Sequence, residues 1–308
     1  MQPREHQTGP RRPAQGSDPR VWQLATLGSL LGYGVFALGF PVGVREIALV
    51  AGPALLVQWF ATRLGAATRF DPKSALISAL SLALLLRTGE PWVLAAAGGF
   101  AVASKFLLRI HGKHVWNPSA LALVAALLLT DSAWLSPGQW GSGTWLAFAA
   151  AGVGGLVVFR AERSDVTWAF AGFWCALLLG RALYIGEPLS VPLHRLQDGA
   201  LLLFTFFMIS DPKTTPDSRA GRIAFAALVA AAAFGLKFGL HVHAGLVYAL
   251  VLCAPLVPLF DLRLPGRRYA WPGARTGAAF QGVLHDRTNP PATSPAVRPD
   301  PARGWARV

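Results

Sequence analysis

The stretch "ALLLFTFFMISDPKTTPDS", residues 200–218, changes character abruptly in its middle. It is almost entirely apolar up to Ile209, and Asp-Pro-Lys follows at residues 211–213. A helix that leaves a membrane for water would give this change, because a spanning helix consists of mostly apolar residues. A polar loop placed for chemistry at the membrane surface would give it as well.

The composition favours a membrane protein. The chain has 308 residues, of which 53% are hydrophobic and 14% are charged, whereas a soluble domain is about 25% charged. Its 32 Gly and 11 Trp also suit lipid surroundings. The net charge of +13 could suit a nucleic acid, but the basic residues lie in the tails and in short gaps between apolar runs. A nucleic-acid binder gathers them on one face, so we expect lipid and not nucleic acid as a partner.

Cysteine and histidine spacing indicates neither a disulfide framework nor a metal site. Cys175 and Cys253 both lie inside apolar runs, and no CxxC or HExxH motif occurs. His241 and His243 are two residues apart and would not share a helix face. If these histidines are functional, proton handling is a better interpretation than metal binding.

The apolar runs predict an all-α, polytopic membrane protein with about ten transmembrane helices. A spanning helix takes about 20 residues and satisfies its own backbone hydrogen bonds. The candidates are residues 21–40, 43–62, 74–88, 91–109, 117–135, 144–160, 165–186, 196–210, 220–238 and 243–260. The third and eighth are short, which is typical of broken helices beside a site. We expect residues 21–262 to form the transmembrane domain, with disordered cytoplasmic tails at 1–20 and 263–308.

The distribution of Lys and Arg predicts the orientation. With the N-terminus in the cytoplasm, the cytoplasmic gaps between spans contain eleven basic residues and the opposite gaps contain five. Both basic tails then also lie inside. Because cytoplasmic loops carry an excess of Lys and Arg, we expect both termini to be cytoplasmic.

A weak internal similarity divides the chain into two halves, at about 21–135 and 144–262. "NPSALALVAAL" from Asn117 can be laid over "HAGLVYALVLC" from His243. Lys105 lies twelve residues before the first block, and Lys237 lies six before the second. Five spans in each half would make the repeats inverted, and inverted repeats commonly hold a site where the halves meet.

Residues 104–120, "SKFLLRIHGKHVWNPSA", are the first candidate site. Lys105 and Lys113 supply positive charge, Gly112 permits a tight turn, and Asn117-Pro118 is a good helix start. The amides of such a helix start could face an anionic ligand. An ordinary basic loop followed by a capped helix explains the same residues, and the sequence leaves both interpretations open.

Two aspartates are further candidates. Asp211-Pro212 is a common turn signal and could simply end the eighth span, but a carboxylate at the mouth of a span also attracts a cation or a proton. Asp198 enters the same span beside Arg195. The two could form an interfacial ion pair, or Asp198 could face a cavity between the halves.

Taken together, these blocks resemble a known family, that of the RnfD and NqrB proteins, which are integral-membrane subunits of the Rnf and Nqr electron-transport complexes. Lys105, Gly112-Lys113 and Asn117-Pro118 follow the family's spacing of a Lys, a Gly-rich turn and "NPA". "FFMISDPKT" (206–214) is similar to its "FFMxTDP", and "PLVPLFD" (255–261) to its "xxAPLFD". "DPKSALISALSLALLL" from Asp71 resembles its third span.

The resemblance covers roughly residues 20 to 262 and implies ten helices in two inverted halves. It implies electron transfer between flavins or to quinone, coupled to Na⁺ or H⁺ movement, in a bacterial cytoplasmic (inner) membrane with other electron-transport subunits as partners. Asp211 and Asp261 match positions implicated in ion uptake. Lys105, Gly112, Lys113, Asn117 and Pro118 are the implied cofactor-binding residues. No catalytic residue follows, and the chain would be at most one subunit of a redox-driven oxidoreductase.

The sequence departs from the family where the covalent flavin attaches. The family has a Thr in an "SGAT"-like motif, but the connection here reads "TDSAWLSPGQWGSGTW", so we expect no covalent flavin at Thr144. Ala244 and Ala254 also replace an acid and an Asn of the last span. Non-covalent flavin (FMN or riboflavin) or quinone remains possible on these residues. The alternatives are a stand-alone transporter or export protein on the same scaffold, linked to a biosynthetic pathway, and a structural subunit without a cofactor.

Overall fold

The computed structural model describes residues 18–67, 69–110, 112–136, 140, 154–155, 158–159 and 161–269. In this part of the chain, five helices are long and apolar enough to cross a membrane, and four shorter apolar helices accompany them. The prediction of an all-α, polytopic membrane protein is confirmed. Most of the predicted sixth span (144–160), Thr144 and nearly all of both predicted tails lie outside the described residues.

The helices of the first half mostly begin at a proline. They are α1 (Pro19–Leu38), α2 (Val44–Arg63), α3 (Pro72–Leu85), α4 (Pro91–Leu107) and α5 (Pro118–Leu129). Proline suits the first helical position because its missing N–H would have no partner there. Asp18, Asp71 and Asn117 precede three of these prolines, and each accepts a hydrogen bond from a backbone N–H of the first turn.

The helices of the second half are more broken. They are α7 (Ser164–Ile185), α8 (Ser190–Leu196), α9 (Gly199–Leu203) with the π-helix η2 (Phe204–Met208), α10 (Arg219–Phe234) with the π-helix η3 (Gly235–Gly239), α11 (Gly245–Cys253), η4 (Ala254–Leu256) and α12 (Val257–Arg263). The eighth predicted span is therefore short and irregular, as expected. Single π-turns inside α-helices are rare and frequently occur at functional sites.

Two short strand pairs correct the predicted ends of three spans. Residues predicted as helix form β1 (Leu86–Thr88), which pairs antiparallel with β4 (Ala133–Leu135). The side chains of Thr88 and Ser132 hydrogen-bond at 3.2 Å beside this pair. The helices stop early because Gly89 and Pro91 follow β1 and the turn residues Thr130, Asp131 and Ser132 precede β4. In addition, β2 (Arg109–Ile110) pairs with β3 (Lys113–His114) around Gly112, whose φ is 73°.

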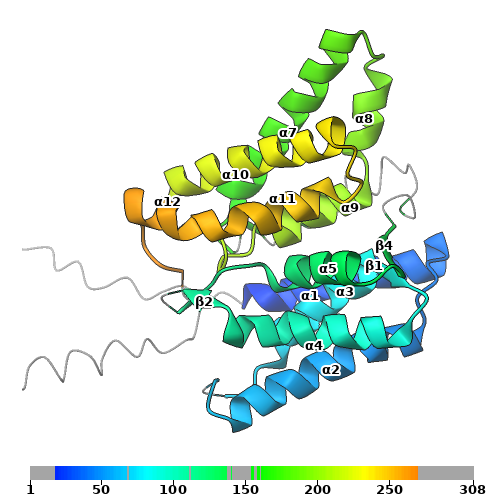
Figure 1. Ribbon diagram of the computed structural model, residues 1–308, viewed down its shortest axis with the longest axis vertical. Helices are drawn as coiled ribbons and strands as arrows, with labels where there is room; N and C mark the ends of the chain where they lie inside the picture. The colour runs from blue at the N-terminus through cyan, green and yellow to red at the C-terminus, as the bar shows by residue number, and fades with distance from the viewer. Residues whose placement is uncertain are drawn as a thin grey trace, which may run out of the picture. The chain divides into compact units, whose positions relative to one another are not determined.

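The same order of helix packing occurs twice. The most extensive pairs are α2 with α4 and α7 with α10, and α4 then packs on α5 as α10 packs on α11. The helices α5 and α11 join the two sets, which Figure 1 shows as neighbouring layers. The corresponding helices α4 and α10 finish at opposite ends of the bundle, α4 towards β2 and α10 away from it. The repeat is therefore inverted.

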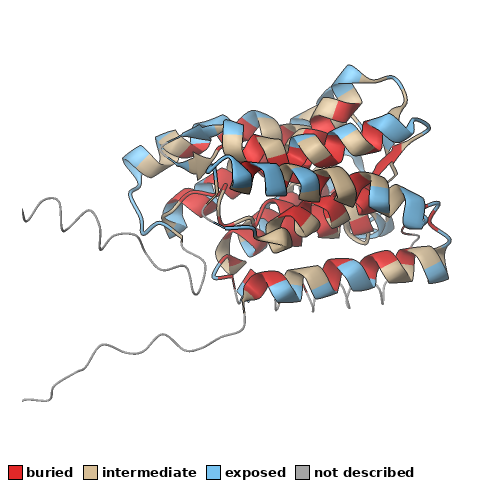
Figure 2. Cartoon of the chain, turned by 90° about the horizontal axis from the view of Figure 1, so that it is seen from below, coloured by how far each residue is buried: buried red, intermediate tan, exposed pale blue. Residues whose placement is uncertain are grey.

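The surface distribution of apolar side chains fits lipid surroundings. Buried residues lie on the faces where helices meet, and exposed positions line the outer faces (Figure 2). Many of the exposed positions are large and apolar, including Phe36 at 92% exposed and Tyr184 at 91%. A soluble monomer rarely exposes so many side chains of this kind, so these outer faces are suited to contact with hydrocarbon.

Candidate functional site

Polar side chains gather at the two ends of the helix bundle. One cluster, here called the Asp211 end, lies where α3, α5 and α10 begin and where η2 and α12 finish. The other, the Lys237 end, lies where α3, α5 and η3 finish and where α9 and α11 begin. In Figure 1 these ends are marked by β2 with α12 and by β1 with β4, respectively. Both clusters combine residues from the two halves.

At the Asp211 end, Lys105 is held by the start of α3. The residue is only 6% exposed, and its Nζ donates to the carbonyl oxygen of Ser74 at 2.7 Å and to Ser74 Oγ at 3.0 Å. Asp211 and Asp71 lie within electrostatic reach. A buried ammonium is costly unless it is paired, so these contacts fix Lys105 where the two halves meet.

Asn117 connects the halves directly. Its Oδ1 accepts from the N–H of Ala120 and caps α5. Its Nδ2 donates to the carbonyl oxygen of Met208 at 3.2 Å and to Asp211 Oδ2 at 3.4 Å. The sequence predicted Asn117 as a helix cap or as part of a binding site. The cap is present, and it also carries the contact with Asp211.

Asp211 both ends the helical segment and belongs to this cluster. Its Oδ1 accepts from the N–H of Lys213 at 3.0 Å, and its carbonyl oxygen accepts from the N–H groups of Thr214 and Thr215. Burial raises the pKa of the Asp211 carboxyl above its ordinary value, although the Lys213 N–H and the nearby cations oppose the rise. The carboxylate has no ion-pair partner within 4 Å among the described residues.

The predicted residues Lys113 and Asp261 form a separate, adjoining cluster. Lys113 Nζ lies 2.9 Å from Asp217 Oδ1 and 2.8 Å from Asp261 Oδ2. Asp261 Oδ1 accepts the N–H of Asp217 at 2.7 Å. The turn at Gly112 and the short strand β3 place Lys113 there. Beside it, burial and the neighbouring cations lower the pKa of His114 to about 4, so His114 is neutral at physiological pH.

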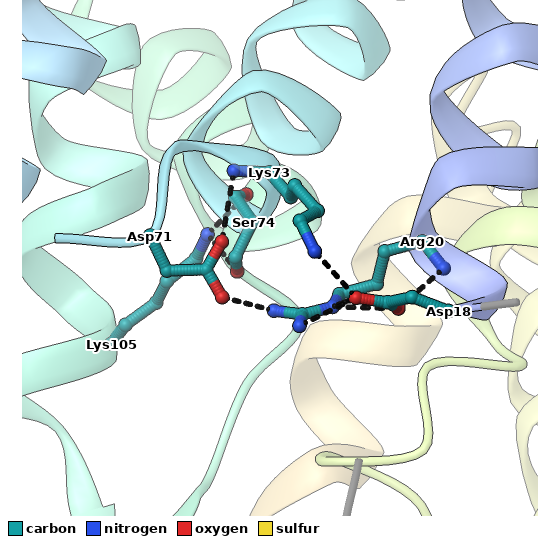
Figure 3. A network of polar contacts seen from close by, with 6 residues as sticks. All are labelled: Asp18, Arg20, Asp71, Lys73, Ser74 and Lys105. Carbon is teal, nitrogen blue, oxygen red and sulfur yellow. Dashed lines mark hydrogen bonds and ion pairs between the residues drawn. The ribbon is translucent and has the colours of Figure 1, made fainter. Parts of the chain in front are cut away.

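A four-residue ion network fixes the starts of α1 and α3 at the same end (Figure 3). Arg20 pairs with both Asp18 and Asp71, and Lys73 Nζ lies 2.7 Å from Asp18 Oδ2. Sequence reasoning missed this network, because Asp18 and Arg20 fell in the predicted tail. Asp71 also lies within electrostatic reach of Lys105, so the network is continuous with the cluster around Asp211.

Acid below the ordinary pKa of Asp18, 3.8, should weaken this network. Burial alone would raise the pKa of Asp18, but hydrogen bonds from Arg20 and Lys73 lower it to about 2. A lowered folded-state pKa stabilises the fold above the ordinary value of 3.8, and this contribution is lost as pH falls from there towards 2. Allowing for partial exposure, we expect a loss of about 1 kcal/mol. Thermal unfolding in detergent measures it.

The matched control for this prediction is Asp18→Asn, which removes the titrating group and keeps its shape. The variant should be less stable than the native protein near neutral pH, and its stability should fall less between pH 4 and pH 2. Equal acid sensitivity of the two proteins would show that Asp18 does not carry the effect.

The Lys237 end contains a cavity of about 430 Å³ between the halves. Its polar lining comes from Trp134, Ser136, Asp198, Lys237 and His243. Its walls are apolar and include Leu85, Leu127, Phe204, Met208, Leu246 and Val247. Phe204 and Met208 belong to η2 and Lys237 belongs to η3, so both π-helices line this cavity.

Lys237 and Asp198 both line this cavity, and they form no ion pair with each other within 4 Å. Asp198 caps α9 by accepting the N–H of Ala200 at 2.9 Å, and it is in electrostatic reach of Lys237. Within the described ranges, the side chain of Lys237 forms no hydrogen bond to another side chain or to the backbone. Of the two sequence interpretations of Asp198, the structure favours the residue that faces the cavity, since Arg195 pairs with Glu187.

The comparisons with known proteins agree on one family. A family model described as "NQR2, RnfD, RnfE family" matches residues 129–269. The D subunit of the ion-translocating oxidoreductase complex from Stutzerimonas stutzeri is 28% identical over 266 residues, covering 64% of this chain and 75% of the relative. The protein of the same name from Pseudomonas paraeruginosa is 28% identical over 267 residues, covering 66% and 78%. That from Tolumonas auensis is 35% identical over 80 residues, covering 26% and 23%.

Proposed function

Because the chain belongs to the NQR2, RnfD, RnfE family, we propose that it is a membrane subunit of an ion-translocating electron-transport complex. Relatives named as the D subunit of such a complex align over about two thirds of this chain. The apolar helices supply the membrane location that this role needs. Other subunits of the complex would be its partners, and the excess of basic residues around the Asp211 end favours a cytoplasmic position for that end.

We further propose that the cavity at the Lys237 end holds a flavin or quinone without a covalent bond. Such a group would supply reversible uptake of electrons. The volume of about 430 Å³ falls in the range of small-molecule sites. Apolar walls with a few convergent polar groups suit a flat ring that has hydrogen-bonding edges. The observation that carries the proposal is the side chain of Lys237 in η3, a cation without a hydrogen-bond partner in the described chain, in a cavity that residues of both π-helices line.

The residues that line the cavity would each make a different contact with the flavin or quinone. Lys237 would donate a hydrogen bond to a ring oxygen or nitrogen and favour negative charge there. Asp198 would accept from an N–H and limit that positive field, because it lies within electrostatic reach of Lys237. Leu246, Val247 and Phe204 would exclude water from the ring faces.

The test is the cofactor content of the protein purified in detergent. We expect extractable flavin or quinone. We expect Lys237→Met to lower the amount retained by about tenfold, because the bound group would lose one charged hydrogen bond. Lys213→Met is the matched control, because Lys213 is a partly buried lysine at the other end of the bundle. It should retain the native amount.

A colourless preparation without extractable flavin or quinone would contradict this cofactor site. Equal retention in Lys237→Met and the native protein would exclude the cavity as the place of binding. In the first case the transporter alternative gains support, because the same inverted scaffold with a polar cavity between its halves is typical of transporters.

A further inference from the structure

Arg163, which immediately precedes α7, has an unusual set of hydrogen bonds. The residue is only 4% exposed. Its Nη1 donates to the carbonyl oxygen of Glu162 at 3.0 Å, whereas Nε and Nη2 are buried without a hydrogen-bond partner among the residues that the structure describes. These two nitrogens lie on one edge of the guanidinium and donate in parallel, which matches two oxygens of a carboxylate or a phosphate. Leaving such donors unpaired in a buried site is costly.

The nearest acids do not satisfy this edge. Asp165 is occupied by Arg222, whose Nε lies 2.8 Å and 2.9 Å from its two carboxylate oxygens. Asp217 pairs with Lys113. Asp211 lies within electrostatic reach of Arg163 but forms no ion pair with it. No acid in the described part of the chain therefore neutralises the charge on Arg163 by a direct contact.

A second cation, Lys213, lies near the same aromatic ring as Arg163, that of Tyr269. The guanidinium carbon is 4.8 Å from the ring centre of Tyr269, and Lys213 Nζ is 5.9 Å from the same centre. Lys213 Nζ also donates to the carbonyl oxygen of Tyr269 at 3.1 Å. Two cations from different loops thus lie close to one aromatic ring at the Asp211 end.

Tyr269 reaches this position on residues 264–269, which follow α12 and are here called the cover segment. The segment runs close against the start of α10. At Gly266 a Cβ atom would lie 2.4 Å from the backbone nitrogen of Ser218, so only glycine fits there. Tyr269 is thereby held over both cations.

We propose that Arg163 and Lys213 bind the phosphate group of an anionic ligand and that Tyr269 covers the bound group. Phosphate suits the site better than carboxylate, because its additional oxygens can reach Lys213 while two of them occupy the fork of Arg163. Two sources share this chemistry: the head group of an anionic phospholipid at the membrane surface and a soluble phosphate compound. The inference does not depend on the electron-transport role.

Titration of the full-length protein in detergent with inorganic phosphate tests the site. Native protein should bind phosphate saturably, followed by calorimetry and by a rise in the thermal midpoint. Arg163→Gln should weaken binding by about tenfold or more, and Arg163→Lys, which keeps the charge and loses the fork, should weaken it by less. Tyr269→Ala, which removes the cover, should change the phosphate affinity while the protein stays folded.

Arg181→Gln is the matched control, because Arg181 also stacks on an aromatic ring, that of Phe238 at 4.6 Å. It lies in the last turns of α7, whereas Arg163 precedes the first turn of the same helix. The variant should bind phosphate as the native protein does. Unchanged affinity in Arg163→Gln would overturn the proposal, and so would an equal loss in Arg181→Gln. Loss of saturable phosphate binding in variants of Arg163 and Lys213, but not in Arg181→Gln, would support it.

The second arm of the experiment distinguishes the sources. The same proteins are mixed with phosphatidylcholine vesicles with and without phosphatidylglycerol, and retained lipid is measured by native mass spectrometry. Phosphatidylglycerol retained by the native protein and lost in Arg163→Gln would identify a lipid head group. Phosphate binding without such retention would identify a soluble ligand. If Arg163→Gln changes neither reading, the site does not exist.

Discussion

Replacing Gly98 with alanine should strongly destabilise the protein, whereas replacing the adjacent Gly99 should not. Gly98 lies in α4 where it packs on α2, the most extensive helix contact of the first half. A Cβ atom at Gly98 would lie 2.1 Å from the carbonyl oxygen of Val50 and 2.9 Å from its carbonyl carbon. Because these are backbone atoms of a packed helix, the two helices would have to separate. We expect a loss of about 3 kcal/mol, at the upper end of overpacking effects.

Gly99→Ala is a closely matched control. Its Cβ would make ordinary contacts at 3.7 Å with Pro53 and Val57. Both substitutions replace glycine by alanine inside the same helix, so the gain in helix propensity is equal and cancels in the comparison. The thermal midpoint and the yield of detergent-purified protein measure the difference. If the two variants were equally stable, the close approach of α2 and α4 at Gly98 would be wrong.

The sequence predicted the helices well because their signals are local. Apolar runs of about the required length mark the spans, and Asn117-Pro118 marks a helix start, without reference to the rest of the fold. The inverted repeat was predicted from the weak similarity between the blocks that begin at Asn117 and His243, and from the count of five spans in each half. The strand pairing of β1 with β4 did not follow, because two three-residue segments far apart in the chain carry no periodic signal.

The candidate site was predicted only in part, for a physical reason. Lys105, Asn117 and Asp211 lie in recognisable motifs, and the structure brings them together at one end. Whether the polar group of each residue already has a hydrogen-bond partner depends on tertiary contacts, such as the hydrogen bond from Lys105 to Ser74. That Nε and Nη2 of Arg163 have no hydrogen-bond partner in the described chain likewise cannot be predicted from the sequence. An arginine between two spans usually indicates only a position at the membrane interface.

On the proposed function, Asp211→Asn should strongly reduce ion movement, whereas Asp261→Asn should mainly cost stability. Both acids were predicted for ion uptake from the family resemblance, but their surroundings differ. Asp261 is committed to Lys113 and to the N–H of Asp217. Asp211 has no ion-pair partner within 4 Å among the described residues, and burial raises its pKa, so proton or cation uptake is easier at this group. An amide in its place cannot change charge.

The measurement is made on the assembled complex in sealed membrane vesicles, with electron transfer and ion movement followed together and normalised to folded protein. For Asp211→Asn we expect a fall of about tenfold or more in ion movement, as for loss of an essential proton-transferring group, with a nearly native thermal midpoint. For Asp261→Asn we expect a loss of about 1 to 3 kcal/mol in stability, because Lys113 loses one of two charged partners. Its activity per folded molecule should stay near native. The reverse pattern, with coupling lost only in Asp261→Asn, would assign ion uptake to the cluster around Lys113 instead of to the interface between the two inverted halves.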